Sequence, residues 1–590
     1  MKREEVKKEN TWALEDLYET EAEYQADLKR LREEIRTFTS YQGKLGKSAK
    51  TLLKALDAFS RMSLRNEKIY VYANQSMHQD MGNHHCQEMA MEAQNLMNQL
   101  NMAVSFLEPE LIRIPEETLT RFLDEEKQLR NYRRFLEEIF RRKAHTLSED
   151  KEAWMARAEE LGQGPSNIFS MFQNADLSFP QIKDEQGMDV SLTQGNYLRY
   201  MESKDRRVRK EAFRALHGSY GQFSNTLAAV YEANAKQAAF FAKERGYNSA
   251  LEAALDGSNI PVSVYDNLIS TVRMHLDLLH QYMEIRKRRM GLEKLHIYDL
   301  YVSMAKAPDR RISFEEAKKI TKAGLAPLGD DYQRILQEGY DHRWIDVYEN
   351  EGKRTGAYSW GAYGTHPYVL LNYQGNLNSV FTLAHEMGHA LHSYYSDQAQ
   401  DYLYAGYRIF VAEVASTCNE ALLIHHLLEH AEDEKERFYL VNYFLEQFRT
   451  TLYRQTMFAE FEKQTHQMAA KGAPLTSEVL CGLYRNLNQD YFGKAVVLDP
   501  EISYEWSRIP HFYTPFYVYQ YATGFSAAIS ISNRILKGEK GIVERYKQFL
   551  SGGNSMEPIE LLKLCDVDMT SPKPIDEAFQ VFASYLKEAN

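Results

Sequence analysis

Two histidines and a glutamate near the middle of the chain have the spacing of a metal-binding motif. They form the stretch His385-Glu386-Met387-Gly388-His389. On an α-helix, residues four apart lie on one face, so His385 and His389 can direct two imidazole nitrogens at one Zn²⁺ ion. Glu386 borders the same face and can act on a water molecule without binding the metal itself. The spacing therefore predicts a zinc site with Glu386 as the general base.

A catalytic zinc site needs a third protein ligand, and Glu413 is the candidate. Such sites use three protein ligands and keep one position for water. Glu413 lies 24 residues after His389, which is far enough for a turn and an antiparallel return helix. Its stretch is otherwise apolar and rich in small residues, where a buried carboxylate needs a partner such as a cation. Glu420 lies two turns farther along the same face, and we expect it to orient a ligand histidine.

The other histidines do not have this spacing. His392 follows His389 by three residues, but two ligands on one helix leave little room for a third, so we interpret it as a neighbour. The groups at 84–86 and 425–430 are not joined to a second cluster of ligands. We interpret both groups as ordinary polar residues.

A second group of polar aromatic residues lies near the C-terminus. His511 precedes the pair Thr514-Pro515, which is typical of the first residues of a helix and predicts that one begins there. On that helix Tyr517 and Tyr519 would point about 200° apart, so they cannot both face one site. Attack of water on an amide develops an oxyanion, which His and Tyr side chains can stabilise by donating hydrogen bonds. The alternative is an aromatic packing cluster.

These residues must be positioned by a chain that is mainly α-helical. Its 590 residues include only 15 prolines and 30 glycines, which disfavours a turn-rich β fold. One segment, 356–375, is rich in aromatic and β-branched residues and predicts one or two strands broken near Gly364 and Pro367. Helical spacing recurs elsewhere in long stretches, namely 12–38, 50–80, 84–107, 118–142, 196–247, 262–291, 314–338 and from about 379 onward.

The composition changes at 179–188, where turn residues predict a small hairpin. We therefore expect two domains. The first is an N-terminal helical domain, residues 1–195, and the second is a catalytic domain, residues 196–590.

Charge and cysteine content exclude several classes of protein. The 71 Lys and Arg residues against 83 Asp and Glu residues give a net charge of −12, which argues against nucleic-acid binding by phosphate neutralisation. The four cysteines form no C-x-x-C pair, so a disulfide framework is not expected. The N-terminal segment lacks an apolar stretch typical of a secretory signal, and no apolar run spans a membrane. These features predict a cytoplasmic protein.

The motifs together resemble one family. The stretches Phe381–His392, Phe410–Glu420 and Ile509–Gly524 are similar to the oligoendopeptidase F group of the thimet-oligopeptidase-like zinc metallopeptidases, and the likeness extends over almost the whole chain. The resemblance implies a mainly α, two-lobed helical metallopeptidase with a small β-sheet beside the zinc helix. It also implies a deep substrate channel that admits short peptides and excludes folded proteins.

The resemblance implies a role for each site residue. One zinc ion per chain is bound by His385, His389 and Glu413, and Glu386 is the catalytic base.

The resemblance also implies that His511 and a tyrosine stabilise the oxyanion. Tyr519 matches the family's pattern best. The loop after His511 is shorter than in the thimet oligopeptidases, so Tyr513 or Tyr517 is an alternative.

The expected function is a zinc-dependent endopeptidase that hydrolyses internal bonds of short oligopeptides. An exposed strand at 356–372 would pair with an extended peptide through its backbone, giving broad sequence tolerance. Two alternatives remain at this point. One is an exopeptidase of the dipeptidyl carboxypeptidase type on the same scaffold, and the other is a helical peptide-binding protein with a structural metal. The sequence does not give the oligomeric state.

Overall fold

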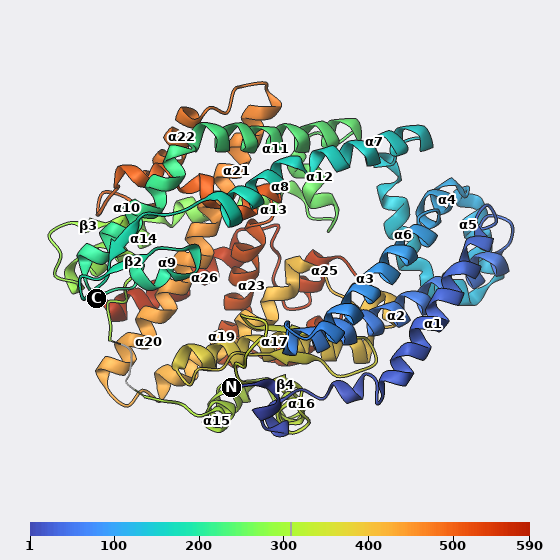
Figure 1. Cartoon of the computed structure of the whole chain (residues 1–590), viewed down its shortest axis with the longest axis horizontal. Coiled ribbons are helices and arrows are strands. Elements are labelled where there is room, and N and C mark those ends of the chain that lie inside the picture. The colour runs from blue at the N-terminus through green and yellow to red at the C-terminus, as the bar shows by residue number, and fades with distance from the viewer. Residues whose placement is uncertain (307–309) are drawn as a thin grey trace. The chain divides into compact units, whose positions relative to one another are not determined.

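The computed structural model of the protein describes residues 1–306 and 310–590. Within them the chain is mainly α-helical with three small sheets, which confirms the predicted fold class (Figure 1). The chain divides into two compact units, each assembled from three stretches. Unit 1 consists of residues 1–146, 310–426 and 531–566, and unit 2 consists of residues 147–309, 427–530 and 567–590.

The two units do not follow the predicted boundary at residue 195, which lies inside unit 2. Helical periodicity shows which face of a segment is buried, but it does not show which distant segment covers that face. The chain passes from one unit to the other five times, and packing between distant segments decides the compact units. The division of the chain into two consecutive domains at residue 195 stays a prediction.

In residues 12–139 of unit 1, the helices bury their apolar residues in one hydrophobic core, which also includes Tyr368 and Leu370. Thr20 and Ser48 begin the first two long helices, because each side chain accepts a hydrogen bond from a backbone N–H in the first turn. The helices of unit 1 are α1 (Glu21–Phe38), α2 (Ala49–Gln79), α3 (His84–Val104), α4 (Leu107–Arg113), α5 (Glu116–Glu125), α6 (Arg133–Arg141), α15 (Phe314–Gly324), α16 (Asp330–Asp341), α17 (Leu377–Ala399), α18 (Tyr402–Ala405), most of α19 (Ile409–Glu429), α24 (Ile542–Leu550) and α25 (Pro558–Lys563).

Unit 2 is also helical. Its predicted hairpin is confirmed as the antiparallel pair β1 (Gln181–Lys183) and β2 (Asp189–Ser191), and β3 (Leu295–His296) pairs in parallel with β7 (Val496–Val497). Its helices are α7 (Glu149–Gly162), α8 (Gly164–Met171), α9 (Gln194–Met201), α10 (Arg206–Gln222), α11 (Ser224–Glu244), α12 (Ala250–Asp256), α13 (Val262–Met274), α14 (Leu276–Arg289), α20 (Glu434–Gln447), α21 (Arg454–Ala470), α22 (Ser477–Phe492), most of α23 (Tyr519–Leu536) and α26 (Lys573–Ala589).

A three-stranded sheet in unit 1 confirms the strands predicted in 356–375. Its strands are β4 (Ile345–Asp346), β5 (Tyr358–Trp360) and β6 (Tyr368–Leu370), in the order β4-β6-β5. β6 lies in the middle, parallel to β4 and antiparallel to β5. Helix α17, which carries His385 and His389, contacts both β5 and β6. The sheet therefore lies beside the helix that carries the metal motif, as expected.

The segment after His511 differs from the prediction. The predicted helix start at Thr514-Pro515 is wrong, because α23 begins at Tyr519. Phe516 has a φ of 60°, in the left-handed region, where a helix cannot continue. The pair Thr514-Pro515 therefore lies in a turn that precedes the helix.

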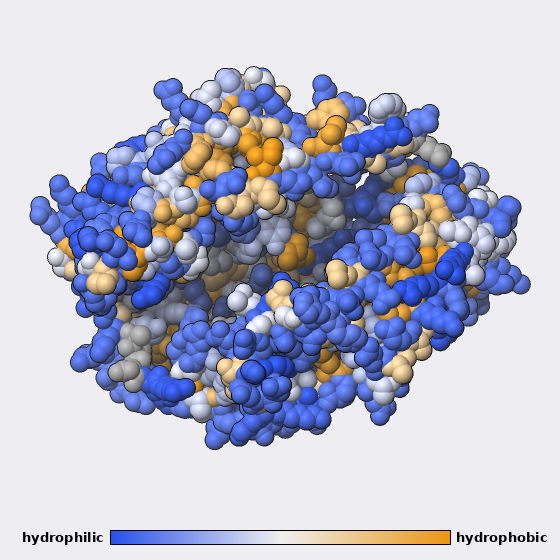
Figure 2. Space-filling model, in the orientation of Figure 1, coloured by the Kyte–Doolittle hydropathy of each residue, from blue (hydrophilic) through white to orange (hydrophobic). Residues whose placement is uncertain are grey.

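The surface combines hydrophilic and hydrophobic residues, as the composition does. On the face shown in Figure 2, hydrophilic residues predominate and hydrophobic residues lie in small groups between them. None of the helices in the described part of the chain combines the length and the apolar character that crossing a membrane requires.

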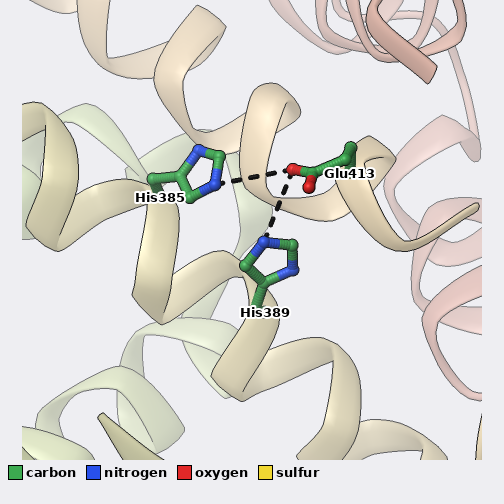
Figure 3. A group of neighbouring side chains, drawn as sticks. All are labelled: His385, His389 and Glu413. Atoms are coloured by element: carbon green, nitrogen blue, oxygen red, sulfur yellow. Dashed lines mark ion pairs between the residues drawn. The ribbon is translucent and has the colours of Figure 1, made fainter. Parts of the chain in front are cut away.

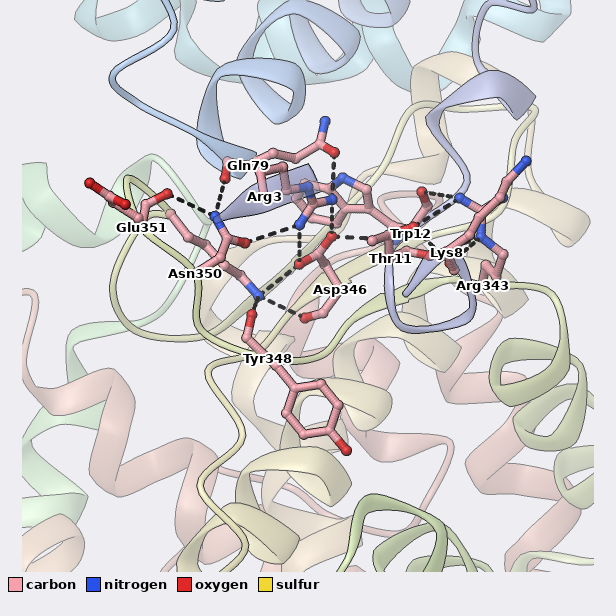
Figure 4. A network of polar contacts seen from close by, with 11 residues as sticks. Arg3, Lys8, Thr11, Trp12, Gln79, Arg343, Asp346, Tyr348, Asn350 and Glu351 are labelled. Carbon is pink, nitrogen blue, oxygen red and sulfur yellow. Dashed lines mark hydrogen bonds and ion pairs between the residues drawn. The ribbon is translucent and has the colours of Figure 1, made fainter. Parts of the chain in front are cut away.

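A buried ionic network fastens the N-terminal segment to the sheet of unit 1 (Figure 4). The Asp346 carboxylate on β4 accepts a hydrogen bond from Arg3 Nη1 at 2.9 Å and forms an ion pair with Lys353 Nζ at 2.7 Å. The Lys353 and Asp346 side chains are both fully buried. Burial lowers the pKa of Lys353, and the negative charge of Asp346 opposes that shift. The network therefore depends on the carboxylate that faces both cations.

Replacing Asp346 by alanine should destabilise unit 1. The variant leaves Lys353 buried beside no carboxylate, which should lower the free energy of unfolding by about 3–5 kcal/mol. The shift in the urea midpoint measures this loss. Glu9→Ala is the control, because its ion pair with Lys7, at 3.7 Å, is exposed and should contribute less than about 1 kcal/mol. Equal shifts in the two variants would contradict the role of Asp346.

Candidate metal centre

Helix α17 presents the two histidines of the motif on one face. The helix begins after Asn376, whose side chain accepts a hydrogen bond from the Ser379 N–H. His385 and His389 follow two to three turns later, with ring centroids 4.9 Å apart and ring planes at 82°. The predicted helical placement of the motif is confirmed.

Helix α19 brings Glu413 to both histidines (Figure 3). Glu413 Oε2 lies 3.5 Å from His385 Nε2 and 3.5 Å from His389 Nε2. These distances are longer than hydrogen bonds. They are close to the separation of about 3.3 Å that tetrahedral geometry gives two ligands at zinc–ligand distances of about 2.0–2.1 Å. Within the described ranges, this is the single group of three or more His, Cys, Asp or Glu residues with a metal-binding arrangement. The donor set and its spacing fit a zinc ion.

The charges around the two rings favour a cation. Burial lowers the pKa of His385, but the nearby Glu420 carboxylate and the other two glutamates together raise it to about 9. Burial raises the pKa of Glu413, but the two histidines and a hydrogen bond from Ser416 Oγ hold it at about 2. Three carboxylates thus surround the two imidazoles, and a positive charge stabilises that arrangement.

Two further glutamates, Glu386 and Glu420, lie near the candidate ligand group. Glu386 is 7% exposed, and burial raises the pKa of its carboxyl although both histidines oppose the shift. A carboxyl with a raised pKa holds a proton more readily near neutral pH. Glu420 Oε1 lies 3.5 Å from His385 Nδ1, on the side of the ring opposite Glu413. Their expected roles, as base and as orienting carboxylate, stay predictions.

A close approach of α17 and α19 sets the position of Glu413. A Cβ atom added to Gly388 would lie 2.6 Å from Ser416 Cα and 2.9 Å from the Ala415 carbonyl oxygen. The absence of a side chain at Gly388 therefore lets the two helices meet within one residue of the ligand His389. The role of this glycine was not evident from the sequence, although its place inside the motif was a signal.

Asn419 connects three helices around the same contact. Its Nδ2 donates a hydrogen bond to the Ala384 carbonyl oxygen on α17 at 3.0 Å. Its Oδ1 accepts a hydrogen bond from the Tyr332 hydroxyl on α16 at 2.9 Å. Asn419 is fully buried in an apolar stretch, so its polar atoms require these partners. The role of Asn419 was not evident from the sequence either, because its partners are distant in sequence.

His392 lies outside the ligand group, as predicted. Its ring is fully buried and stacks on Tyr407, with centroids 3.7 Å apart and planes at 6°. Burial lowers its pKa to about 3, so the imidazole stays neutral at neutral pH. His392 therefore packs in the core and is not part of the candidate ligand group.

The second group of predicted residues belongs to unit 2. His511 is exposed, and its ring centroid lies 6.1 Å from Tyr517 and 5.9 Å from Tyr521. Tyr519 is only 2% exposed and packs against Tyr265, with centroids 5.1 Å apart. The tyrosines beside His511 are therefore those at 517 and 521. Tyr513, the other alternative, stacks on Phe169 at 4.2 Å.

Comparison with known proteins identifies the family. Residues 199–581 match the model of peptidase family M3, and residues 110–179 match the model described as oligopeptidase F. The chain belongs to peptidase family M3. This M3 peptidase is 48% identical to oligopeptidase PepF of Bacillus subtilis over 99% of its own length and 88% of the relative's. It is 40% identical to an oligoendopeptidase F homologue of Lactococcus lactis, over 99% and 98% of the two chains.

Solved structures agree with this assignment. Oligoendopeptidase-F from Enterococcus faecium is 39% identical to this M3 peptidase and superposes with a TM-score of 0.76, covering 96% and 98% of the two chains. A crystal structure from Chlamydophila abortus is 35% identical, with a TM-score of 0.93 over 100% and 99% of the chains. The chain is therefore a peptidase, and the predicted family and enzyme class are confirmed.

Adding a methyl group at Gly388 should weaken metal binding. Gly388→Ala forces α17 and α19 apart, because its Cβ has no room against the backbone of Ser416. We expect zinc affinity to fall about 10–100-fold, as measured by competition with a chromogenic chelator. Gly482→Ala is the matched control, since its Cβ on α22 would meet no atom within 4 Å. Unchanged affinity in Gly388→Ala would contradict the proposed spacing role.

Proposed function

We propose that this M3 peptidase is a zinc-dependent endopeptidase that hydrolyses internal bonds of short oligopeptides. The observation that carries the proposal is the distance of 3.5 Å from Glu413 Oε2 to both histidine Nε2 atoms, beside the buried carboxyl of Glu386. The names of the relatives, oligopeptidase PepF and oligoendopeptidase F, support oligopeptides as the substrate class.

His385, His389 and Glu413 would hold one zinc ion per chain. Structural zinc sites usually have four protein ligands, often cysteines, whereas this group offers two histidines and one carboxylate. When bound, zinc supplies Lewis acidity, which lowers the pKa of water toward about 7 and polarises a carbonyl group. The donor set therefore supports a catalytic rather than a purely structural metal.

Glu386 would move the proton. It follows a ligand in the chain, and its carboxyl is buried and has a raised pKa. Such a group accepts the proton of the attacking water and then donates it to the leaving amine. Both transfers use the same carboxyl, so no second acid is required.

His511 and a tyrosine would stabilise the oxyanion by donating hydrogen bonds. Tyr519 is the residue expected from the family pattern, but its side chain is 2% exposed. Tyr517 is partly exposed and lies against His511. We therefore favour Tyr517 over Tyr519 as the partner of His511.

Strand β5 would bind the peptide backbone. It is an edge strand, and Tyr358 and Trp360 pair with β6. Since the backbone groups of a strand alternate in direction, the N–H and C=O of Ser359 point away from β6. An extended peptide that pairs there is held by its main chain, which tolerates many side chains. The deep channel that would limit substrate length stays a prediction.

A cleavage map of blocked peptides tests the function and the base together. The zinc-loaded protein should cut internal bonds of peptides with acetylated and amidated ends, and a chelator should stop this. Glu386→Gln should lower kcat by about 10²–10⁴-fold while zinc content stays at one per chain, because glutamine cannot accept the proton. Mass spectrometry of the products and elemental analysis measure both results.

The control in this assay is Glu478→Gln, which changes an exposed glutamate in the first turn of α22. It should retain both activity and zinc. Removal of residues only from free ends would favour an exopeptidase instead. Peptide binding without any cleavage would favour a binding protein.

Variants of the second group should separate the two tyrosines. His511→Ala and Tyr517→Phe should each lower kcat by about 10²–10³-fold with little change in zinc content, because each removes an oxyanion donor. Tyr519→Phe should leave kcat within a few-fold of the parent protein. Steady-state kinetics on one blocked peptide measure all three. A large loss of kcat in Tyr519→Phe alone would assign the oxyanion role to Tyr519 instead.

A further inference from the structure

Unit 2 contains a buried carboxyl that the proposed chemistry does not use. Glu462 on α21 is fully buried. Its Oε1 accepts a hydrogen bond from the Phe516 backbone N–H at 3.0 Å. Its Oε2 has no hydrogen-bond partner in the described part of the chain. Burying a polar atom without a hydrogen-bond partner costs free energy, so the unpaired Oε2 calls for an explanation.

The partner of Glu462 has an unfavourable backbone conformation. Phe516 has a φ of 60°, which is rare for a bulky residue that is not glycine. Such a conformation persists only where the surroundings fix it. Three contacts do so here. They are the hydrogen bond that the Phe516 N–H donates to Glu462, the ring of His466 at a centroid distance of 4.6 Å and the ring of Tyr265 at 5.8 Å.

The turn at Phe516 determines where the next residue points. Tyr517 follows directly, and its ring lies 6.1 Å from His511 in a stacked arrangement. At the other end of the turn, the Phe512 carbonyl oxygen accepts a hydrogen bond from Asn234 Nδ2 at 3.1 Å. Both hydrogen bonds are buried, and their side-chain partners, Asn234 and Glu462, lie on helices α11 and α21. The exposed His511 and the partly exposed Tyr517 thus belong to a segment that is fixed at two buried points.

We propose that Glu462 is a positioning residue, which holds Phe516 in the left-handed conformation and thereby keeps Tyr517 beside His511. This inference rests on the proposed function, because it assigns the second group a task that needs a fixed geometry. Glu462 itself does not touch the substrate.

The bond needs an acceptor but not a negative charge. Burial raises the pKa of Glu462 to about 8, although the Phe516 N–H opposes the shift. The carboxyl is therefore largely neutral at neutral pH, and its carbonyl oxygen still accepts the N–H. Glutamine has the same acceptor and a similar shape, whereas leucine has none.

Two variants at position 462 test the role. Glu462→Gln should keep kcat within about two-fold of the parent protein. Glu462→Leu should lower kcat at least ten-fold with KM little changed, because the oxyanion donors lose their geometry but the peptide still binds. Thr465→Val is the matched control. It removes a buried hydroxyl of the same helix, which bonds Tyr231 at 2.7 Å, and it should lower stability without lowering kcat.

A second pair of variants separates positioning from a general loss of stability. Glycine adopts positive φ without strain. In a Phe516→Gly background, the hydrogen bond to Glu462 is therefore no longer required to hold residue 516 at positive φ. Adding Glu462→Leu to Phe516→Gly should therefore lower kcat by less than three-fold further. An equal loss in both backgrounds would overturn the proposal. If Glu462→Leu alone does not fold, the loss from Phe516→Gly to the double variant decides the test, and a loss of ten-fold or more there would overturn the proposal.

Crystal structures give a readout that does not depend on activity. In Glu462→Leu, Phe516 should leave positive φ and the Tyr517 ring should move away from His511. An unchanged turn would overturn the proposal, whatever the kinetics. If His511→Ala and Tyr517→Phe both retain full kcat, the oxyanion assignment fails, and the structure of Glu462→Leu still decides whether Glu462 holds the turn.

Discussion

The candidate site depends on the contact between helices α17 and α19. Backbone meets backbone at Gly388 and Ser416, and this places Glu413 Oε2 at an equal distance of 3.5 Å from two imidazole nitrogens. Local sequence explains why the two histidines share one face, whereas helix packing explains how Glu413 comes to lie beside them. The bonds of Asn419 to α17 and α16 hold the same contact in register. A shift of one helix by a fraction of a turn would separate the carboxylate from both rings.

Much of the metal site could be predicted from the sequence because its rules are local. The four-residue spacing of His385 and His389 fixes their common face, and a lone glutamate in an apolar stretch identifies Glu413. The strands at 358–360 and 368–370 were also accessible, since aromatic and β-branched residues interrupt the helical pattern there.

The parts that could not be predicted depend on distant contacts. Thr514-Pro515 has the local signature of a helix start, but the buried environment holds Phe516 at positive φ and delays α23 to Tyr519. Propensity is overridden there by tertiary contacts. The two interleaved units were missed for the same reason, because periodicity does not reveal which segments pack together. The roles of Gly388 and Asn419 likewise depend on their contacts with neighbouring helices.

All three ligand residues belong to unit 1, whereas His511 belongs to unit 2. Under the proposed function, the residues that hold the ion and a residue that speeds the reaction would come from different stretches of the polypeptide. Sequence variation in residues 427–530 would then alter turnover without altering zinc affinity. The rate of such an enzyme could evolve independently of how tightly it binds its metal.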